Sequence, residues 1–129
     1  MYDKMYVRGI LIRNNKILLE KINGVYQLPG GVVIDNEFLK EALIRNFYVK
    51  YGLHITVRRG RVYDLLQIPL EYIYFVKTDD DVLDPNLKWI SIDQFFNIPF
   101  YQEQLKQKML EHFHSYDEME DVIFIENTN

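Results

Sequence analysis

Short apolar stretches, separated by turn-forming residues, run along most of this chain. Each is four to eight residues long and rich in β-branched or aromatic side chains, a pattern typical of strands. The expected strands are 5–12, 16–21, 25–28, 71–77 and 87–92, with a further strand region, bent or broken at Gly60, between residues 54 and 66.

Two longer segments carry apolar residues every three or four positions, as the buried face of a helix does. The apolar positions are Leu39, Ala42, Leu43 and Phe47 in the first segment and Leu105, Met109, Leu110 and Phe113 in the second. A short helix capped by Ser91 or Asp93 is expected before Pro99. Strands and helices in this order predict an α/β fold.

The stretch from Tyr26 to Leu53 contains the strongest local signals in the chain. Pro29 excludes the helical region for the residue before it, and Gly30-Gly31 allows a ligand to approach the main chain closely. Asp35 or Asn36 is expected to cap the following helix, and Gly52 to end it in a left-handed turn. The stretch is therefore predicted to form a strand, a glycine turn and a helix that ends at Gly52.

Composition narrows the class of protein. The chain has 129 residues, 48% of them apolar, and no cysteine, which suits one globular domain without disulfides or thiolate metal sites. The formal charge is −4, but the segment 115–129 holds five acidic and no basic residues, so the rest of the chain is nearly neutral. We therefore expect no binding to nucleic acid polymers. No apolar run reaches membrane-spanning length, so we expect a cytoplasmic protein and no membrane partner.

The stretch from Gly31 to Leu53 resembles the Nudix box, whose family pattern is Gx5Ex7REUxEExGU, with U a bulky aliphatic residue. The matching positions are Gly31, Glu37, Arg45, Gly52 and Leu53, preceded by the usual Leu28-Pro29-Gly30. The departures are Asn46, Phe47, Val49 and Lys50, so all three glutamates of REUxEE are absent. The box is degenerate: its frame is present and its metal-binding residues are replaced.

This resemblance implies a Nudix-like α/β/α sandwich around a mixed β-sheet. Residues 1–114 are expected to form a single domain of this kind. Residues 115–129 would be an acidic C-terminal extension, either with an added strand at 122–125 or as a tail that docks on a partner or a second copy. A homodimer is therefore one expected assembly.

In the Nudix family, the glutamates that are missing here hold the magnesium ions that drive pyrophosphate cleavage. The resemblance thus implies no resident metal in the box, and Mg²⁺ only if residual hydrolase activity exists. Glu37 and Glu41 are the acidic remnants, and both can pair with Arg45, Glu41 through its four-residue helical spacing. Glu41 and Glu71 are the weak candidates for a metal ligand. Glu37, Arg45, Gly52 and Leu53 are expected to act structurally.

Lys50 allows a sharper hypothesis about the ligand. Its ammonium, close to the vacated metal position, could contact a phosphate directly, or it could lie in solvent and favour the helix dipole. We expect Gly30, Gly31, Arg45 and Lys50 to contact a small phosphorylated, nucleotide-like ligand.

The expected function is therefore that of a Nudix hydrolase homologue for nucleoside diphosphate-linked ligands. With Asn46, Val49 and Lys50 in place of glutamates, it would be weakly active, or a pseudoenzyme that binds nucleotides. Two alternatives stay open: an active Mg²⁺-dependent pyrophosphohydrolase with carboxylates outside the box, and a protein-interaction domain. The sequence leaves open whether the chain catalyses.

Overall fold

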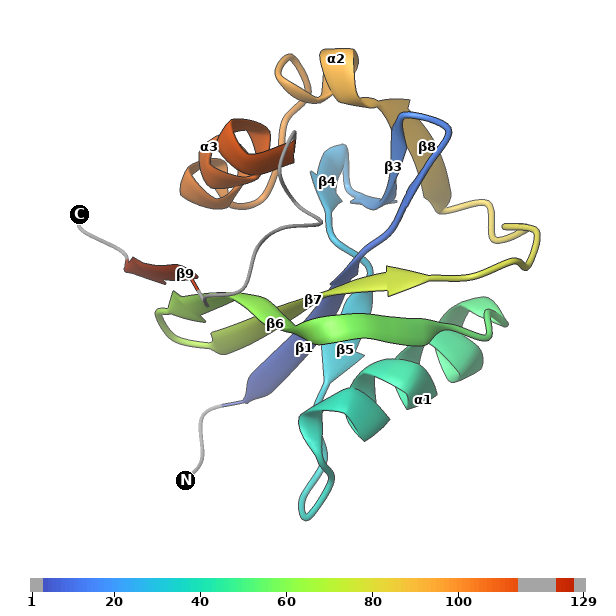
Figure 1. The fold of residues 1–129 in the computed structure, drawn as a ribbon, viewed down its shortest axis with the longest axis vertical. Coiled ribbons are helices and arrows are strands. Elements are labelled where there is room, and N and C mark those ends of the chain that lie inside the picture. The colour runs from blue at the N-terminus through green and yellow to red at the C-terminus, as the bar shows by residue number, and fades with distance from the viewer. Residues whose placement is uncertain (1–3, 114–122, 127–129) are drawn as a thin grey trace.

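A computed structural model describes residues 4–113 and 123–126 of the chain. Five strands precede the first helix, three strands follow it, and two further helices and a last strand complete the described order (Figure 1). The strands are β1 (Met5–Ile10), β2 (Ile12–Arg13), β3 (Lys16–Ile22), β4 (Val25–Gln27), β5 (Gly30–Val32), β6 (Thr56–Leu66), β7 (Leu70–Lys77), β8 (Leu87–Ser91) and β9 (Ile123–Glu126). The helices are α1 (Leu39–Tyr51), α2 (Ile92–Phe95) and α3 (Glu103–His112).

The strands form two sheets. The larger is mixed, in the order β5-β1-β7-β6-β9, with β1–β7 and β6–β9 parallel and the other pairs antiparallel. The smaller is antiparallel and joins β3 to β2, β4 and β8. The predicted mixed α/β architecture is confirmed, whereas the division into two sheets was not predicted.

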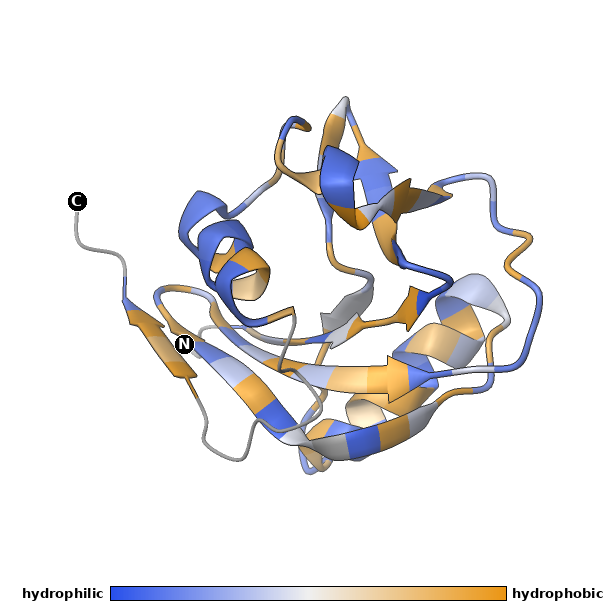
Figure 2. Cartoon of the chain, turned by 45° about the horizontal axis from the view of Figure 1, so that its top comes forward, coloured by the Kyte–Doolittle hydropathy of each residue, from blue (hydrophilic) through white to orange (hydrophobic). Residues whose placement is uncertain are grey.

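Apolar clusters cover both faces of the larger sheet. On one face, α1 packs Ala42, Leu43 and Phe47 against strand residues such as Val7 and Val76. On the other face, a second cluster joins the sheet to α3, α2 and the smaller sheet. Figure 2 shows α3 blue on its outer side and orange toward the strands. The helix α1 is thus held against the sheet by its apolar residues, while its opposite face is free for other contacts.

Several local predictions are confirmed and two are wrong. Gly52 ends α1 in a left-handed conformation with φ 70°, and Ser91 caps α2 by accepting a hydrogen bond from Gln94 N. The segment 5–12 is not one strand, because the chain leaves the larger sheet at Leu11 and continues in the smaller one. Neither Asp35 nor Asn36 caps α1: the N-cap residue is Phe38, with no side-chain hydrogen bond.

The C-terminal extension contributes a strand to the larger sheet. Residues Ile123–Glu126 form β9, which pairs in parallel with β6 from Tyr63 to Leu66. This corresponds to the added-strand alternative, while residues 115–122 and 127–129 of the predicted extension lie outside the described residues. Within the described ranges, no helix is both long enough and apolar enough to cross a membrane.

Candidate functional site

An ion pair joins the middle of α1 to the segment that precedes the helix. Arg45 Nε donates to Glu37 Oε2 at 2.6 Å and Arg45 Nη2 to Glu37 Oε1 at 3.0 Å, so the contact is bidentate. Arg45 Nη2 also donates to the Val32 carbonyl, at 2.9 Å. The hydrogen bonds from Arg45 hold the pKa of Glu37 below its usual value. These two side chains are engaged with each other and with the backbone, which gives them a structural role.

The pairing predicted for Glu41 is wrong, whereas the ligand contact predicted for Arg45 stays a prediction. The Arg45 guanidinium is bound to Glu37 and to the carbonyl of Val32. Glu41 was expected to share in the pairing; it is exposed on the first turn of α1, and no ion pair between it and Arg45 occurs in the described ranges. The distance along the helix favours such a pair, but the bidentate contact with Glu37 uses the same guanidinium.

Gly30 and Gly31 occupy positions that no side chain could share. A Cβ on Gly30 would lie 2.0 Å from the Val7 carbonyl oxygen, and the φ of Gly30 is 154°. A Cβ on Gly31 would lie 2.1 Å from Asn46 Oδ1. Both glycines are therefore required for the close approach of β5 to β1 and to α1. That approach leaves the Gly30 carbonyl facing the last turn of the helix.

Asn46 stands at the first missing glutamate position and is buried between β5 and α1. Its Nδ2 donates to the carbonyls of Ala42 at 2.8 Å and Val32 at 3.1 Å. An amide can donate in this way and a carboxylate cannot. Asn46 therefore fastens the strand to the helix through its nitrogen.

We predict that Asn46→Asp destabilises the fold by about 1–3 kcal/mol, because a buried carboxylate would lose two hydrogen bonds and face two carbonyl oxygens. The free energy of unfolding, measured by urea denaturation, checks this. Asn86→Asp is the matched control, since Asn86 is exposed and receives the same change of charge. Equal losses in the two variants would contradict the role given to the Asn46 amide.

Lys50 lies at the third missing glutamate position, and its ammonium is bound to the glycine turn. Lys50 Nζ donates to the Gly30 carbonyl oxygen at 2.5 Å and lies 3.9 Å from Glu20 Oε1. Its side chain is 39% exposed, so one side of the ammonium faces solvent. The Lys50 ammonium is therefore bound to the glycine turn, and its predicted contact with a phosphate stays a prediction.

Glu20 lies beside Lys50 and the glycine turn, although it was not among the site residues predicted from the sequence. It is a buried residue of β3 whose Oε1 accepts hydrogen bonds from Tyr51 OH at 2.9 Å and from Gln27 Nε2 at 3.2 Å. Burial raises the pKa of Tyr51 well above its ordinary value, which keeps its hydroxyl protonated as a donor. Tyr51 OH also accepts from Gly30 N at 3.2 Å. Strand β3, the glycine turn and the end of α1 thus meet at one polar cluster, which we call the Lys50 cluster (Glu20, Gln27, Gly30, Lys50, Tyr51).

The other candidate ligand for a metal is engaged elsewhere. Glu71, on β7, is buried and forms an ion pair with Arg8, and Tyr101 OH donates to Glu71 Oε1 at 3.2 Å. Arg8 in turn donates to the Leu28 carbonyl at 2.9 Å. Glu71 is therefore a partner of a buried arginine, and its carboxylate is not free to bind a metal.

Nudix hydrolases generally hold a divalent cation at the box, and the residues present here do not fit one. The Gly30 carbonyl carries an ammonium, Asn46 points its nitrogen at two backbone oxygens, and Val49 is an exposed alkyl group. In the described part of the chain, no three His, Asp or Glu residues cluster as metal ligands would. A divalent cation bound as in the family would need the box glutamates, which are absent, and the Gly30 carbonyl, which is bound to Lys50.

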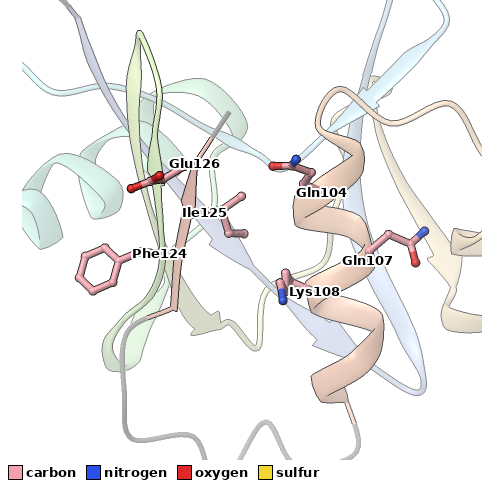
Figure 3. Close-up of a pocket in the computed structure, with 6 residues that line it drawn as sticks. All are labelled: Gln104, Gln107, Lys108, Phe124, Ile125 and Glu126. Carbon is pink, nitrogen blue, oxygen red and sulfur yellow. The ribbon is translucent and has the colours of Figure 1, made fainter. Parts of the chain in front are cut away.

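A separate groove lies between α3 and β9. It has a volume of about 470 Å³ and is lined by Gln104, Gln107, Lys108, Phe124, Ile125 and Glu126 (Figure 3). Figure 3 shows the Ile125 side chain pointing toward α3, whereas Phe124 points away from it. None of these residues belongs to the Lys50 cluster. The groove is therefore a different feature from the glycine turn.

No family model matches this sequence, and no curated protein matches it. Solved structures do match it along most of its length. An ADP-ribose pyrophosphatase from Streptococcus suis is 20% identical with a TM-score of 0.72, over 98% of this chain and 100% of that one. A UDP-X diphosphatase is 17% identical with a TM-score of 0.73, over 97% of this chain and 68% of that one.

A third match is a Nudix family hydrolase from Clostridium perfringens. It is 19% identical with a TM-score of 0.72, and the match covers 90% of this chain and 99% of the other. This chain has the Nudix fold.

Proposed function

We propose that this chain binds a small phosphorylated ligand of the nucleoside diphosphate class without a divalent cation, and cleaves it slowly or not at all. One observation carries the proposal: the Lys50 ammonium is bound to the Gly30 carbonyl, at the turn where the family uses a metal. The ADP-ribose pyrophosphatase and the UDP-X diphosphatase among the similar structures support a diphosphate as the ligand.

The charge and exposure of Lys50 suit a phosphate contact. Its ammonium keeps a solvent-facing side, whereas Glu20, its counter-ion, is buried on the protein side. A phosphate approaching from solvent therefore meets the positive charge first. A lysine binds phosphate as a point charge, and such a charge-assisted hydrogen bond contributes about 1.5–3 kcal/mol.

The same residue argues against efficient hydrolysis. A divalent metal lowers the pKa of bound water and generates the attacking hydroxide. An ammonium carries one charge and has no open coordination position, so it cannot supply that nucleophile. Glu71, the candidate carboxylate outside the box, does not replace it, because Glu71 is bound to Arg8. Binding without turnover is the combination that this site favours.

We predict that removing the charge of Lys50 weakens ligand binding. Isothermal titration of ADP-ribose in EDTA should give an affinity about ten-fold lower for Lys50→Met and lower still for Lys50→Glu, because the phosphate loses a charge-assisted partner. Lys40→Met is the matched control, an exposed lysine at the other end of α1. Unchanged affinity in Lys50→Glu would refute the proposal.

The remaining expectations about this protein's setting stay predictions from the sequence. They are a homodimer, a cytoplasmic location and the absence of nucleic acid polymers among its partners.

A further inference from the structure

We propose that Lys50 fills a cation site whose oxygen donors are still in place, so that removing its ammonium allows a divalent cation to bind there. The donors are the Gly30 carbonyl and the carboxylate of Glu20. Glu20 lies on β3, outside the box, so the site is distinct from the family's set of box glutamates. The inference concerns the chain without any ligand and does not depend on the proposed function.

The two oxygen donors are held in position by contacts that do not involve Lys50. Gly30 lies in β5, opposite Arg8 of β1, and its N–H donates to Tyr51 OH. Glu20 lies in β3, and Tyr51 OH and Gln27 Nε2 both donate to its Oε1. Tyr51 therefore contacts both donors. Loss of the Lys50 ammonium would leave this arrangement intact.

The charge of the cluster favours a cation. Glu20 is buried, and the donors other than Lys50 that hold its carboxylate are a neutral hydroxyl and a neutral amide. A buried carboxylate that loses its ionic partner is strongly unfavourable unless a cation returns. Since Lys50 Nζ lies 3.9 Å from Glu20 Oε1 and 2.5 Å from Gly30 O, its removal leaves space and negative potential between those two oxygens.

The donor set suits a hard divalent cation. Mg²⁺ in proteins commonly binds one or two carboxylates and keeps several waters. One carboxylate and one carbonyl meet that requirement, and the exposed side of the Lys50 position admits the waters. In the wild-type chain the ammonium competes directly for both oxygens. The wild-type site therefore excludes divalent cations, although its oxygens would accept one.

The test measures metal binding alone, without nucleotide. Mn²⁺ titrations followed by electron paramagnetic resonance should show affinity at least about ten-fold higher for Lys50→Met and Lys50→Ala than for wild type. The double variant Glu20→Gln/Lys50→Met should lose that gain, because a neutral amide replaces the only carboxylate of the site. Lys40→Met controls for the general loss of one positive charge.

Thermal unfolding of each full-length variant, with and without Mg²⁺, gives a second readout. Mg²⁺ should raise the melting temperature of Lys50→Met and Lys50→Ala and leave that of wild type unchanged. If one of these variants does not fold, the other decides. Mn²⁺ affinity equal to wild type, or a gain that persists in Glu20→Gln/Lys50→Met, would overturn the inference. Failure of the proposed function would appear separately, as absence of ADP-ribose binding to wild type.

Discussion

Glu71→Ala is expected to reduce the free energy of unfolding by about 3–5 kcal/mol, because it leaves a buried arginine without its counter-ion. Arg8 and Glu71 are 8% and 3% exposed, so water cannot replace the lost partner. Arg8 also lies over the rings of Tyr101 and Tyr6, at 5.0 and 5.2 Å from their centres, which fixes its side chain in place. The guanidinium therefore cannot turn out to solvent without disrupting these contacts.

Urea denaturation of the full chain measures this loss. Glu41→Ala is the control, because Glu41 is exposed and its removal should change stability by no more than about 0.5 kcal/mol. The double variant Arg8→Leu/Glu71→Leu should recover much of the stability, since apolar residues of similar volume often replace a buried ion pair without loss. If Glu71→Ala were as stable as Glu41→Ala, the Arg8–Glu71 pair would not stabilise the fold.

Gly30→Ala is expected to destabilise the fold by more than about 3 kcal/mol, through backbone strain and a steric clash together. The new Cβ would meet the Val7 carbonyl oxygen at 2.0 Å and Arg8 Cα at 2.7 Å, and both are backbone atoms that cannot move aside alone. Relief requires β5 to separate from β1. Because the Gly30 carbonyl accepts from Lys50, the same shift would disrupt the Lys50 cluster.

Gly24→Ala provides a matched control for the strain. Gly24 has a φ of 81°, and a Cβ there would meet no atom within 4 Å, so only the cost of the conformation applies, about 1–2 kcal/mol. Denaturation midpoints of the two variants separate strain from clash. If Gly30→Ala lost no more stability than Gly24→Ala, the close packing of β5 on β1 would not be the reason for glycine at position 30.

Much of the fold could be predicted from local signals in the sequence. Glycine, proline and apolar spacing act over a few residues, which is why the glycine turn, α1 and its stop at Gly52 were predictable. The change of sheet at Leu11 was not, because a continuous apolar run does not show which strands it pairs with. The capping prediction failed because Asn36 adopts a left-handed conformation, with φ 66°, before the helix begins.

The candidate site was predictable only where its residues lie in the box. Lys50 and Gly30 were singled out because they stand at family positions. Glu20 was not, since an acidic residue in a strand shows nothing of the carbonyl or ammonium that it meets after folding. The one feature visible in the sequence is that Glu20 directly follows the apolar run Ile17, Leu18 and Leu19, with which it is buried in β3. The sequence likewise does not show that Glu71 is paired, because its partner Arg8 is 63 residues away in the chain.

We propose that the Lys50 ammonium replaces the metal in binding and cannot replace it in catalysis. The most direct measurement compares ADP-ribose binding by the wild-type chain in EDTA and in Mg²⁺. Cleavage of ADP-ribose is measured in the same samples. We expect affinities equal within about two-fold and no metal-dependent cleavage, because the ammonium already occupies the turn. Binding that requires Mg²⁺, or robust Mg²⁺-dependent cleavage, would contradict it.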